Sequence, residues 1–479
     1  MKSWTASLLK IASLAALAGG TFCPSGVVYA QEQQDENAKP KPAAHAPMID
    51  PNDEQNTTDP NALQPDTTPL TGAQSPGLGS TEFRHSYWVP GFTVANTAQS
   101  NPFGGNGGNS AGWFDTTYLA GNLSLLENWS HSHLALNYSG GGYFSTDNSQ
   151  GSGSYQQLGV VQSFNWQRWQ LAFFDEFAYL PTTQFGFGGL SNIGAPGIGG
   201  VLTPGAPGLG NPYVPDQSVL FSNGPRYSNS FTTQATYELS RRGSITLVGS
   251  YGILRFTDSG NIGNDDAIGS IGYNYVLSKK DTLGVLYRFS GYHFMGFPQA
   301  LGNHVFNLAY SRRITGRLAF SLFGGPEITT FRIPIGTSTS RIDGAFGTTF
   351  SYALKSGGLT FGYSHGTSGG SGVLQGSTED QVNAGATRHL SRLWTARGNF
   401  GFSRIHAFTP SNAPSTPGFN SYYFGAGLDR PLGRNANLSF GYTAYVQQLN
   451  DAACLGCGTS TQHQISVGFS WHTRPFVLR

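Results

Sequence analysis

Two cysteines, Cys454 and Cys457, have the spacing of a reactive pair. A Cys-x-x-Cys pair can carry redox chemistry in a βαβ setting, or supply half of a zinc site when a second pair is present. The flanking sequence Ala-Ala-Cys-Leu-Gly-Cys-Gly offers neither context. We therefore predict a small loop disulfide between Cys454 and Cys457, with no metal and no other cofactor.

Two histidines, His131 and His133, are the next candidates for metal binding. On a strand, residues two apart share a face, so both imidazoles could reach one ion. They adjoin Trp129 at a predicted turn, however, where histidine commonly accompanies aromatic residues at a membrane interface. We favour this structural role.

Adjacent carboxylates occur at Asp175-Glu176 and Asp265-Asp266. Neighbours on a strand point to opposite sides, so neither pair can act as an acid and base on one substrate. Asp265-Asp266 is expected at a solvated loop end, with a calcium-binding rim as the alternative. Asp175 shares the parity of an apolar face, which predicts a β-bulge or, if these strands span a membrane, a position above it; that face comprises Leu171, Phe173, Phe177 and Tyr179. No catalytic residue stands out, and an enzyme is not the favoured function.

A larger set of charged side chains alternates with small residues along predicted strands. Such residues share one polar face, where they could act on a passing solute by their charge or brace the wall as internal salt bridges. Both roles remain open. The set comprises Arg288, Arg317, Arg341, Arg397, Glu176, Glu238, Glu327, Asp343 and Asp429.

The composition indicates which elements position these residues. The 479 residues include 66 Gly and 26 Pro, with 11% charged, 38% hydrophobic and 13% aromatic residues. Gly and Pro at this level disfavour a helical bundle, and the aromatic content is too high for a disordered chain. A net charge of +1 argues against a nucleic-acid partner. The composition fits an extended β structure with one polar, solvent-facing side and one apolar side.

The beginning of the chain indicates export. Residues 1–30 contain Lys2 and Lys10, a short apolar core and Val-Tyr-Ala before Gln31, which predicts a signal peptide ending at Ala30. Residues 31–80 are rich in Pro and Asp and poor in aromatics, which predicts a disordered acidic periplasmic linker. Disulfides persist in such an exported chain.

From residue 81 to residue 479 the hydrophobic pattern has period two. Leu438, Phe440, Tyr442, Ala444 and Val446 alternate with small or polar residues. Similar ribbons recur between residues 84 and 472, about eighteen in number, with sixteen as the alternative. Connections alternate between short turns and long loops. The longest loop, residues 181–227, carries the aromatics Phe185, Phe187, Tyr213 and Phe221.

An even number of two-faced strands with short and long connections resembles bacterial outer-membrane β-barrels, and porin-like channels in particular. The resemblance covers residues 81–479 and rests on pattern, without a fingerprint motif. It implies a single closed antiparallel transmembrane β-barrel, all-β, with short periplasmic turns, long external loops and both termini periplasmic. It also implies that the 181–227 loop folds inward as a constriction. Outer-membrane lipid and small hydrophilic solutes would be the partners, and a homo-oligomer is possible.

The C-terminus departs from that pattern, because His472 to Arg479 follow the aromatic Trp471. These residues either extend the last strand or form a short tail. A β-propeller has a similar repeat length, but these ribbons are small and polar on one face, which favours the barrel.

The predicted function is passive diffusion of small hydrophilic solutes across the outer membrane. The barrel segment carries 27 minus 4, or 23, basic residues and 26 minus 8, or 18, acidic residues, which predicts a mild preference for anions. An export duct for a secreted polymer such as a polysaccharide is the main alternative. A structural or enzymatic barrel is the further one.

Overall fold

The structure is a computed structural model that describes residues 70–72, 86–100, 112–146, 152–180, 225–257, 261–332, 338–369, 374–408, 418–450 and 459–478. All of them belong to one compact unit, Ile49–Arg479. The predicted signal peptide lies outside the described residues, as does all of the predicted linker except Leu70–Gly72.

The described chain forms eighteen long strands and one short strand, in keeping with the alternating sequence pattern. Their bounds are β1 Ser86–Ser100, β2 Trp113–Asn128, β3 Ser132–Ser145, β4 Ser152–Asn165, β5 Trp169–Leu180, β6 Arg226–Glu238, β7 Gly243–Phe256, β8 Asn264–Val276, β9 Asp281–Phe294, β10 Ala300–Arg313, β11 Leu318–Arg332, β12 Thr339–Leu354, β13 Gly357–Ser368, β14 Ser377–His389, β15 Thr395–Ala407, β16 Gly418–Pro431, β17 Ala436–Asn450, β18 Thr459–His472 and β19 Phe476–Leu478.

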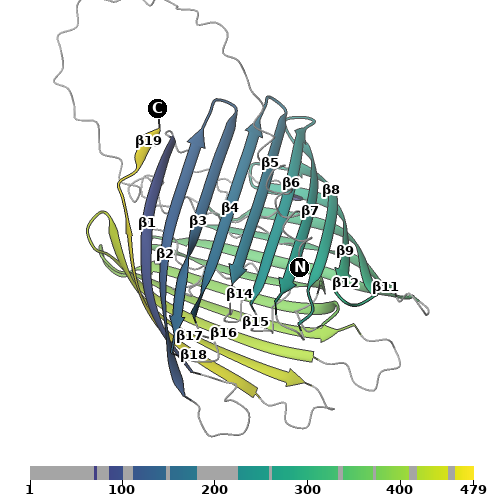
Figure 1. Cartoon of the computed structure of the whole chain (residues 1–479). Coiled ribbons are helices and arrows are strands. Elements are labelled where there is room, and N and C mark those ends of the chain that lie inside the picture. Colours follow the sequence, from purple (N-terminus) through teal and green to yellow (C-terminus); the bar gives the residue numbers. More distant parts are fainter. Residues whose placement is uncertain are drawn as a thin grey trace, which may run out of the picture. The chain divides into compact units, whose positions relative to one another are not determined.

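The eighteen long strands close into one antiparallel barrel (Figure 1). Each strand pairs with its neighbours in the sequence, and β1 pairs with both β2 and β18. Closure satisfies the backbone donors and acceptors of every strand, as a lipid environment requires. The prediction of a single closed antiparallel barrel of about eighteen strands is confirmed.

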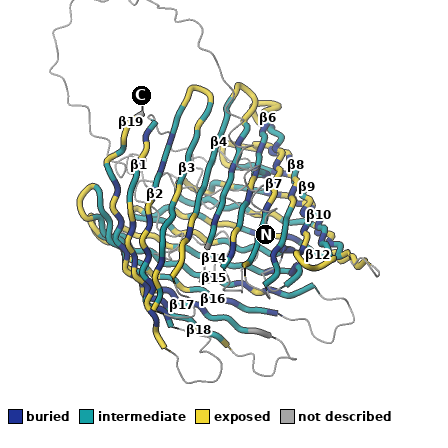
Figure 2. The backbone as a smooth tube through the Cα atoms, viewed as in Figure 1, coloured by how far each residue is buried: buried dark blue, intermediate teal, exposed yellow. Residues whose placement is uncertain are grey.

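The two faces of each strand differ in burial, as Figure 2 shows by its alternating colours. On β10, Phe306 and Leu308 are 49% and 55% exposed, whereas Val305 and Asn307 are 1% and 6% exposed. Because successive side chains point to opposite sides, one parity forms an apolar outer face and the other an inward face. The apolar set predicted on β17 follows this rule, since Phe440 and Tyr442 are exposed on the outer side.

The barrel has two distinct ends, named here by their connections. At the short-turn end, β2–β3, β4–β5 and each later even–odd pair are joined by brief turns. The opposite end, where each odd-numbered strand is joined to the next even-numbered one, carries the longer connections and is called the long-loop end. Strand β1 begins at the short-turn end, because Tyr87 pairs with Leu126 close to the β2–β3 turn.

The C-terminal residues extend the last strand. Strand β18 pairs Gly91 with His472, and β19 pairs Trp88 with Phe476, so the register shifts by one residue between the two. Such a shift is a β-bulge. The rings of Trp88 and Phe476 stack with centroids 4.9 Å apart on the outer face. The chain end therefore contributes an aromatic residue to the short-turn end of the barrel.

No helix in the described ranges is long and apolar enough to cross a membrane.

Candidate functional site

The candidate site is the inward face of the barrel. Its wall is built mainly from small uncharged polar residues, many of them less than 9% exposed, including Thr93, Thr97, Thr116, Asn122, Ser124, Thr232, Gln234, Thr246, Asn303, Ser403 and Ser466. These side chains hydrogen-bond to one another between strands: the amide of Asn122 donates to Thr93 Oγ1 at 2.7 Å, and Thr232 and Ser250 share a hydrogen bond of 2.8 Å. Uncharged polar groups therefore make up most of the wall.

Two of the predicted inward arginines form ion pairs with predicted inward carboxylates. Arg341 Nη2 lies 2.5 Å from Asp343 Oδ2, within one strand on the inward parity of β12. Arg397 Nε lies 2.6 Å from Asp429 Oδ2, joining β15 to β16. Each pair cancels its own charge locally, and the Arg397–Asp429 pair also braces the wall because it joins two strands.

Three further residues of the predicted set keep inward parity but lie apart. Arg288 is on the central part of β9, opposite Ser270 on β8 and Val305 on β10. Glu176 on β5 accepts a hydrogen bond of 3.3 Å from Gln157 Nε2. Glu238 ends β6 at the short-turn end and is exposed. The structure does not gather these charges at one level.

Arg317 lies outside the strand in which it was predicted. Strand β11 begins at Leu318, and Arg317 is a half-buried residue of the β10–β11 turn. The hydroxyl of Thr315 accepts hydrogen bonds from the backbone N–H groups of Arg317 and Leu318, at 3.2 and 3.0 Å. A threonine hydroxyl bonded in this way stabilises a turn, so it holds Arg317 at the end of the barrel rather than on its wall.

Glu327 is inward but buried, with 1% exposure. Its Oε1 accepts hydrogen bonds from Asn303 Nδ2 at 2.7 Å and from the backbone N–H of Thr367 at 3.0 Å. The hydroxyl of Thr329 bonds to that of Thr367 at 3.1 Å. Glu327 therefore ties β11 to β13, which is two strands away, and does not present its carboxylate to an open passage.

This contact is possible because the long-loop end of β13 and β14 leaves the ring. Strand β13 pairs with β12 only as far as His365, whereas it pairs with β14 through Ser368 and Ser377. We name the described residues 366–369 and 374–378 the β13–β14 tip. Since Thr367 of the tip contacts the inward residues Glu327 and Thr329, the tip lies on the inner side of β11.

Apolar packing supports the same placement. The inward residues Tyr292, Phe294 and Leu301 of β9 and β10 form a buried cluster, against which Phe408 after β15 packs. A Cβ added at Gly376 would lie 2.8 Å from Leu301, so the tip backbone approaches this cluster closely. The β13–β14 tip therefore narrows the interior of the barrel at the long-loop end.

Sequence reasoning did not find this tip. The pattern predicts an ordinary long loop from Gly366, and Asn303, Thr367 and Glu379 are not among the predicted site residues. Glu379 is inward, 8% exposed, and accepts a hydrogen bond of 2.7 Å from Ser403. A carboxylate on the small-residue parity of a strand was the available signal, as it was for Glu327.

The predicted constriction residues Phe185, Phe187, Tyr213 and Phe221 lie outside the described residues, as do Cys454 and Cys457. Their roles stay predictions.

Charge is distributed unevenly between wall and turns. Among the described residues, inward parity holds more carboxylates than guanidinium groups: Glu176, Glu238, Asp266, Glu327, Asp343, Glu379 and Asp429 against Arg226, Arg288, Arg313, Arg341 and Arg397. The short turns carry basic residues and no Asp or Glu: Arg168, Arg241, Arg242, Lys279, Lys280, Arg317, Lys355, Arg392 and Arg434. We call these nine residues the basic rim. The positive surplus of the barrel lies there and not on the wall.

In each of the two adjacent carboxylate pairs, one side chain points outward and the other points inward. Asp175 points outward, and its Oδ1 accepts a hydrogen bond of 2.9 Å from Asn229, which is also outward. The predicted bulge is absent, because pairing runs without a shift through Asp175 and Phe231. Asp265 forms an outward ion pair with Arg255 at 2.5 Å. The bulge is therefore not the explanation for Asp175, and the alternative, a position above the membrane, stays a prediction.

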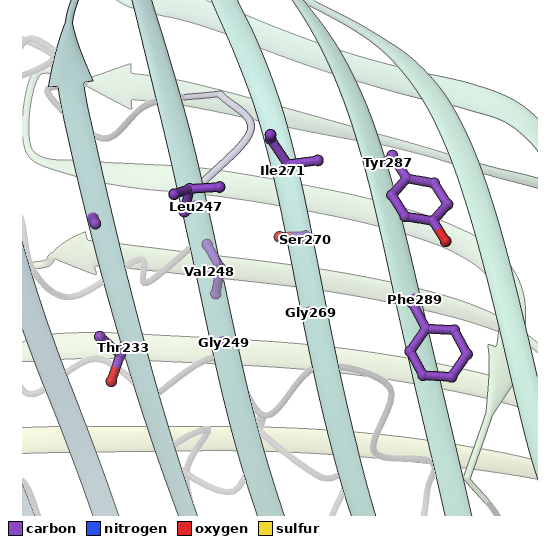
Figure 3. Close-up of a pocket in the computed structure, with 10 residues that line it drawn as sticks. Thr233, Leu247, Val248, Gly249, Gly269, Ser270, Ile271, Tyr287 and Phe289 are labelled. Atoms are coloured by element: carbon purple, nitrogen blue, oxygen red, sulfur yellow. The ribbon is translucent and has the colours of Figure 1, made fainter.

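One hollow belongs to the outer face, not to the lumen. Thr233, Gly249, Gly269 and Phe289 form one row across β6 to β9, each paired with the next. Figure 3 shows the two glycines between the side chains of Thr233 and Phe289. The hollow exists because Gly249 and Gly269 have no side chain, and it faces the side of the barrel that carries the apolar residues.

The described part of the chain contains no cluster of three or more His, Cys, Asp or Glu residues that could hold a metal ion.

Comparison with known proteins gives fold-level similarity only. Neither a protein-family model nor a curated protein matches the chain. Among solved structures, OccK2 (OpdF) of Pseudomonas aeruginosa is 9% identical, with 81% of this chain and 98% of that chain covered and a TM-score of 0.42. OccAB2 of Acinetobacter baumannii is 11% identical, with 80% and 98% covered and a TM-score of 0.41. The outer membrane protein OpdK of P. aeruginosa is 11% identical, with 81% and 99% covered and a TM-score of 0.40.

Proposed function

We propose that this protein is an outer-membrane channel for the passive diffusion of small hydrophilic solutes. The observation that carries the proposal is the complete ring of eighteen strands with an apolar outer face and a polar inward face. A barrel of 16–18 strands is wide enough to leave an aqueous passage. A wall of hydroxyl and amide groups can hydrate such a passage without binding ions tightly.

The width of the passage is set by what folds into it. The β13–β14 tip, held by Glu327 and packed near Leu301, narrows the long-loop end. The 181–227 loop is proposed as a second constriction, since a loop of that length is usually functional or disordered. Both would limit passage to small solutes.

Any preference for anions would arise at the basic rim. The inward wall of the described residues holds more carboxylates than arginines, and two of its arginines are paired. The rim has basic residues without acidic ones in its turns. A positive mouth raises the local concentration of anions. We therefore propose a mild anion preference that acts at entry and weakens in high salt.

Single-channel recording of the purified protein in a planar bilayer tests the proposal. The full-length chain should conduct, and deleting about thirty residues between Gly186 and Asp216 should raise the conductance if this loop lies in the lumen. A full-length protein that is closed, with a deletion that conducts, would instead favour a duct for a larger polymer. If both remain closed, the channel proposal fails.

A pair of variants at Glu327 tests the tip separately. Glu327→Ala removes the acceptor of the Thr367 N–H group, so the tip should loosen and the conductance should rise or fluctuate. Glu327→Gln keeps an oxygen at the same position and should stay close to the unmodified protein. Equal conductance in all three proteins would show that the tip does not restrict the passage.

A further inference from the structure

A short piece of the predicted N-terminal linker lies inside the barrel. Leu70, Thr71 and Gly72 are described, and Thr71 is 2% exposed. The backbone N–H of Thr71 donates a hydrogen bond of 2.9 Å to Asn274 Oδ1. Asn274 is 4% exposed and has inward parity on β8, between the exposed Tyr273 and Tyr275. These three linker residues are therefore an exception to the predicted disorder.

The wall opposite Thr71 is shaped to receive it. Gly272 on β8 and Gly284 on β9 are both inward, and neither has a side chain to occupy the space. A Cβ added at Gly272 would overlap the Thr71 side chain, and one at Gly284 would lie 2.8 Å from Thr71 Cγ2. Leu70 Cδ2 lies 3.5 Å from the same position at Gly284. Two glycines on adjacent strands thus form a notch that Thr71 fills.

Asn274 is held in place to accept the bond. Its Nδ2 donates to Thr246 Oγ1 at 3.2 Å and to Ser244 Oγ at 3.5 Å, both on β7. These contacts fix the orientation of the amide, so that its oxygen faces Thr71. The acceptor is part of the wall and does not depend on the linker for its position.

The position of the notch agrees with the connectivity. Asn274 and Gly284 lie next to the β8–β9 turn, hence at the short-turn end, where β1 also begins. Residues 73–85 join Gly72 to Ser86. An extended chain covers about 3.3–3.6 Å per residue, so this connection can span roughly 45 Å. That exceeds the width of roughly 35 Å expected for eighteen strands spaced about 4.8 Å apart and tilted.

Charge favours the same end. Lys279 and Lys280 of the β8–β9 turn are part of the basic rim, immediately beside the notch. The sequence before Leu70 carries eight acidic residues, from Glu32 to Asp66, against two lysines after the signal peptide. Opposite net charges attract over about one Debye length, about 10 Å at 0.1 M salt.

We infer that the inner wall at the short-turn end is a docking site for the chain's own N-terminal segment, which binds through Leu70–Gly72 and obstructs the passage there. The site takes a turn of the chain, with a small β-branched side chain in the glycine notch and a backbone N–H on Asn274. The consequence for conduction rests on the proposed channel function, whereas the docking does not.

A disulfide trap tests the docking in the full-length protein. Thr71→Cys and Gly284→Cys are combined with Cys23→Ser, Cys454→Ser and Cys457→Ser, so that only the new pair can react. Oxidation should link the peptides that contain residues 71 and 284, as read by mass spectrometry. A matched control pairs Thr71→Cys with Gly362→Cys, an inward glycine on β13, and should not link. Absence of the 71–284 link in a folded barrel, or equal linking in the control, would overturn the proposal.

Limited proteolysis of the unmodified protein provides a second measurement that needs no substitution. Docking should protect the chain around Leu70, so the resistant barrel should begin before residue 70. A resistant fragment that begins near Thr81 would contradict docking.

Conductance separates docking from its consequence. If the protein conducts, the linked 71–284 form should pass several-fold less current than the reduced protein from which residues 31–80 have been removed. A link that forms without any change in current would overturn the obstruction while leaving the docking site in place. A protein that never conducts would count against the channel function alone, since the link is scored independently.

Discussion

Arg397 and Asp429 join β15 to β16 on the inner wall, with Nε 2.6 Å from Oδ2 and Nη2 donating a hydrogen bond of 2.8 Å to Oδ1. Both side chains are about three-quarters covered, at 26% and 21% exposure. The pair crosses between strands near the short-turn end. Because the pair joins two strands, an arginine on the polar wall can stabilise the barrel.

Removing one partner of this pair should destabilise the barrel. Arg397→Gln leaves the Asp429 carboxylate partly buried without its cation, at a cost of about 1–3 kcal/mol. Unfolding in urea from lipid vesicles measures the change, with Asp429→Asn and Arg397→Gln/Asp429→Asn as the remaining corners of a double-mutant cycle. If the two changes add without coupling, the pair contributes nothing to the free energy of unfolding.

Neighbouring residues of β13 offer a test of which face meets lipid. Phe361 is outward and 41% exposed, while Thr360 next to it has inward parity. Phe361→Arg should cost up to about 2–4 kcal/mol if it lies near the middle of the membrane. Thr360→Arg faces the lumen and should cost much less. Comparable losses for both variants, measured by the same unfolding assay, would contradict the assigned faces.

The two lysines of the β8–β9 turn test the source of ion preference. Lys279→Gln/Lys280→Gln lowers the positive charge of the basic rim, so the ratio of anion to cation permeability should fall at low ionic strength. The difference should shrink at high salt, where rim charges are screened. Reversal potentials in a salt gradient provide the measurement. Arg332→Gln, which changes an exposed residue at the long-loop end of β11, is the control; an equal shift there would argue against the rim as the source.

The predicted disulfide is tested by mass spectrometry. The unreduced peptide that contains Cys454 and Cys457 should be lighter than the reduced peptide by two hydrogen atoms. Free thiols at both positions would reject the disulfide. Their reaction with a membrane-impermeant reagent in intact cells would at the same time support an external position for the loop.

The sequence determined the strands and their two faces. Alternation in Leu438, Phe440 and Tyr442 reports which side chains share a side, because successive residues of a strand point in opposite directions by covalent geometry alone. The strand count and the connection lengths follow from the same local signal, and together they predict a closed barrel. The strands could therefore be predicted from the chain itself, and their closure into a barrel from the resemblance of this pattern to outer-membrane β-barrels.

Only the tertiary structure decided which inward residues meet. The contact between Glu327 and Thr367 exists because the β13–β14 tip bends off the ring, and nothing in their spacing encodes that bend. Thr71 hydrogen-bonds to Asn274, which lies more than two hundred positions later in the sequence. Arg317 keeps the parity of a wall residue, yet it lies in the turn that the hydroxyl of Thr315 stabilises, and β11 begins only at Leu318. Parity is local and can be read from the chain, whereas these contacts depend on closure of the ring and on what folds into it.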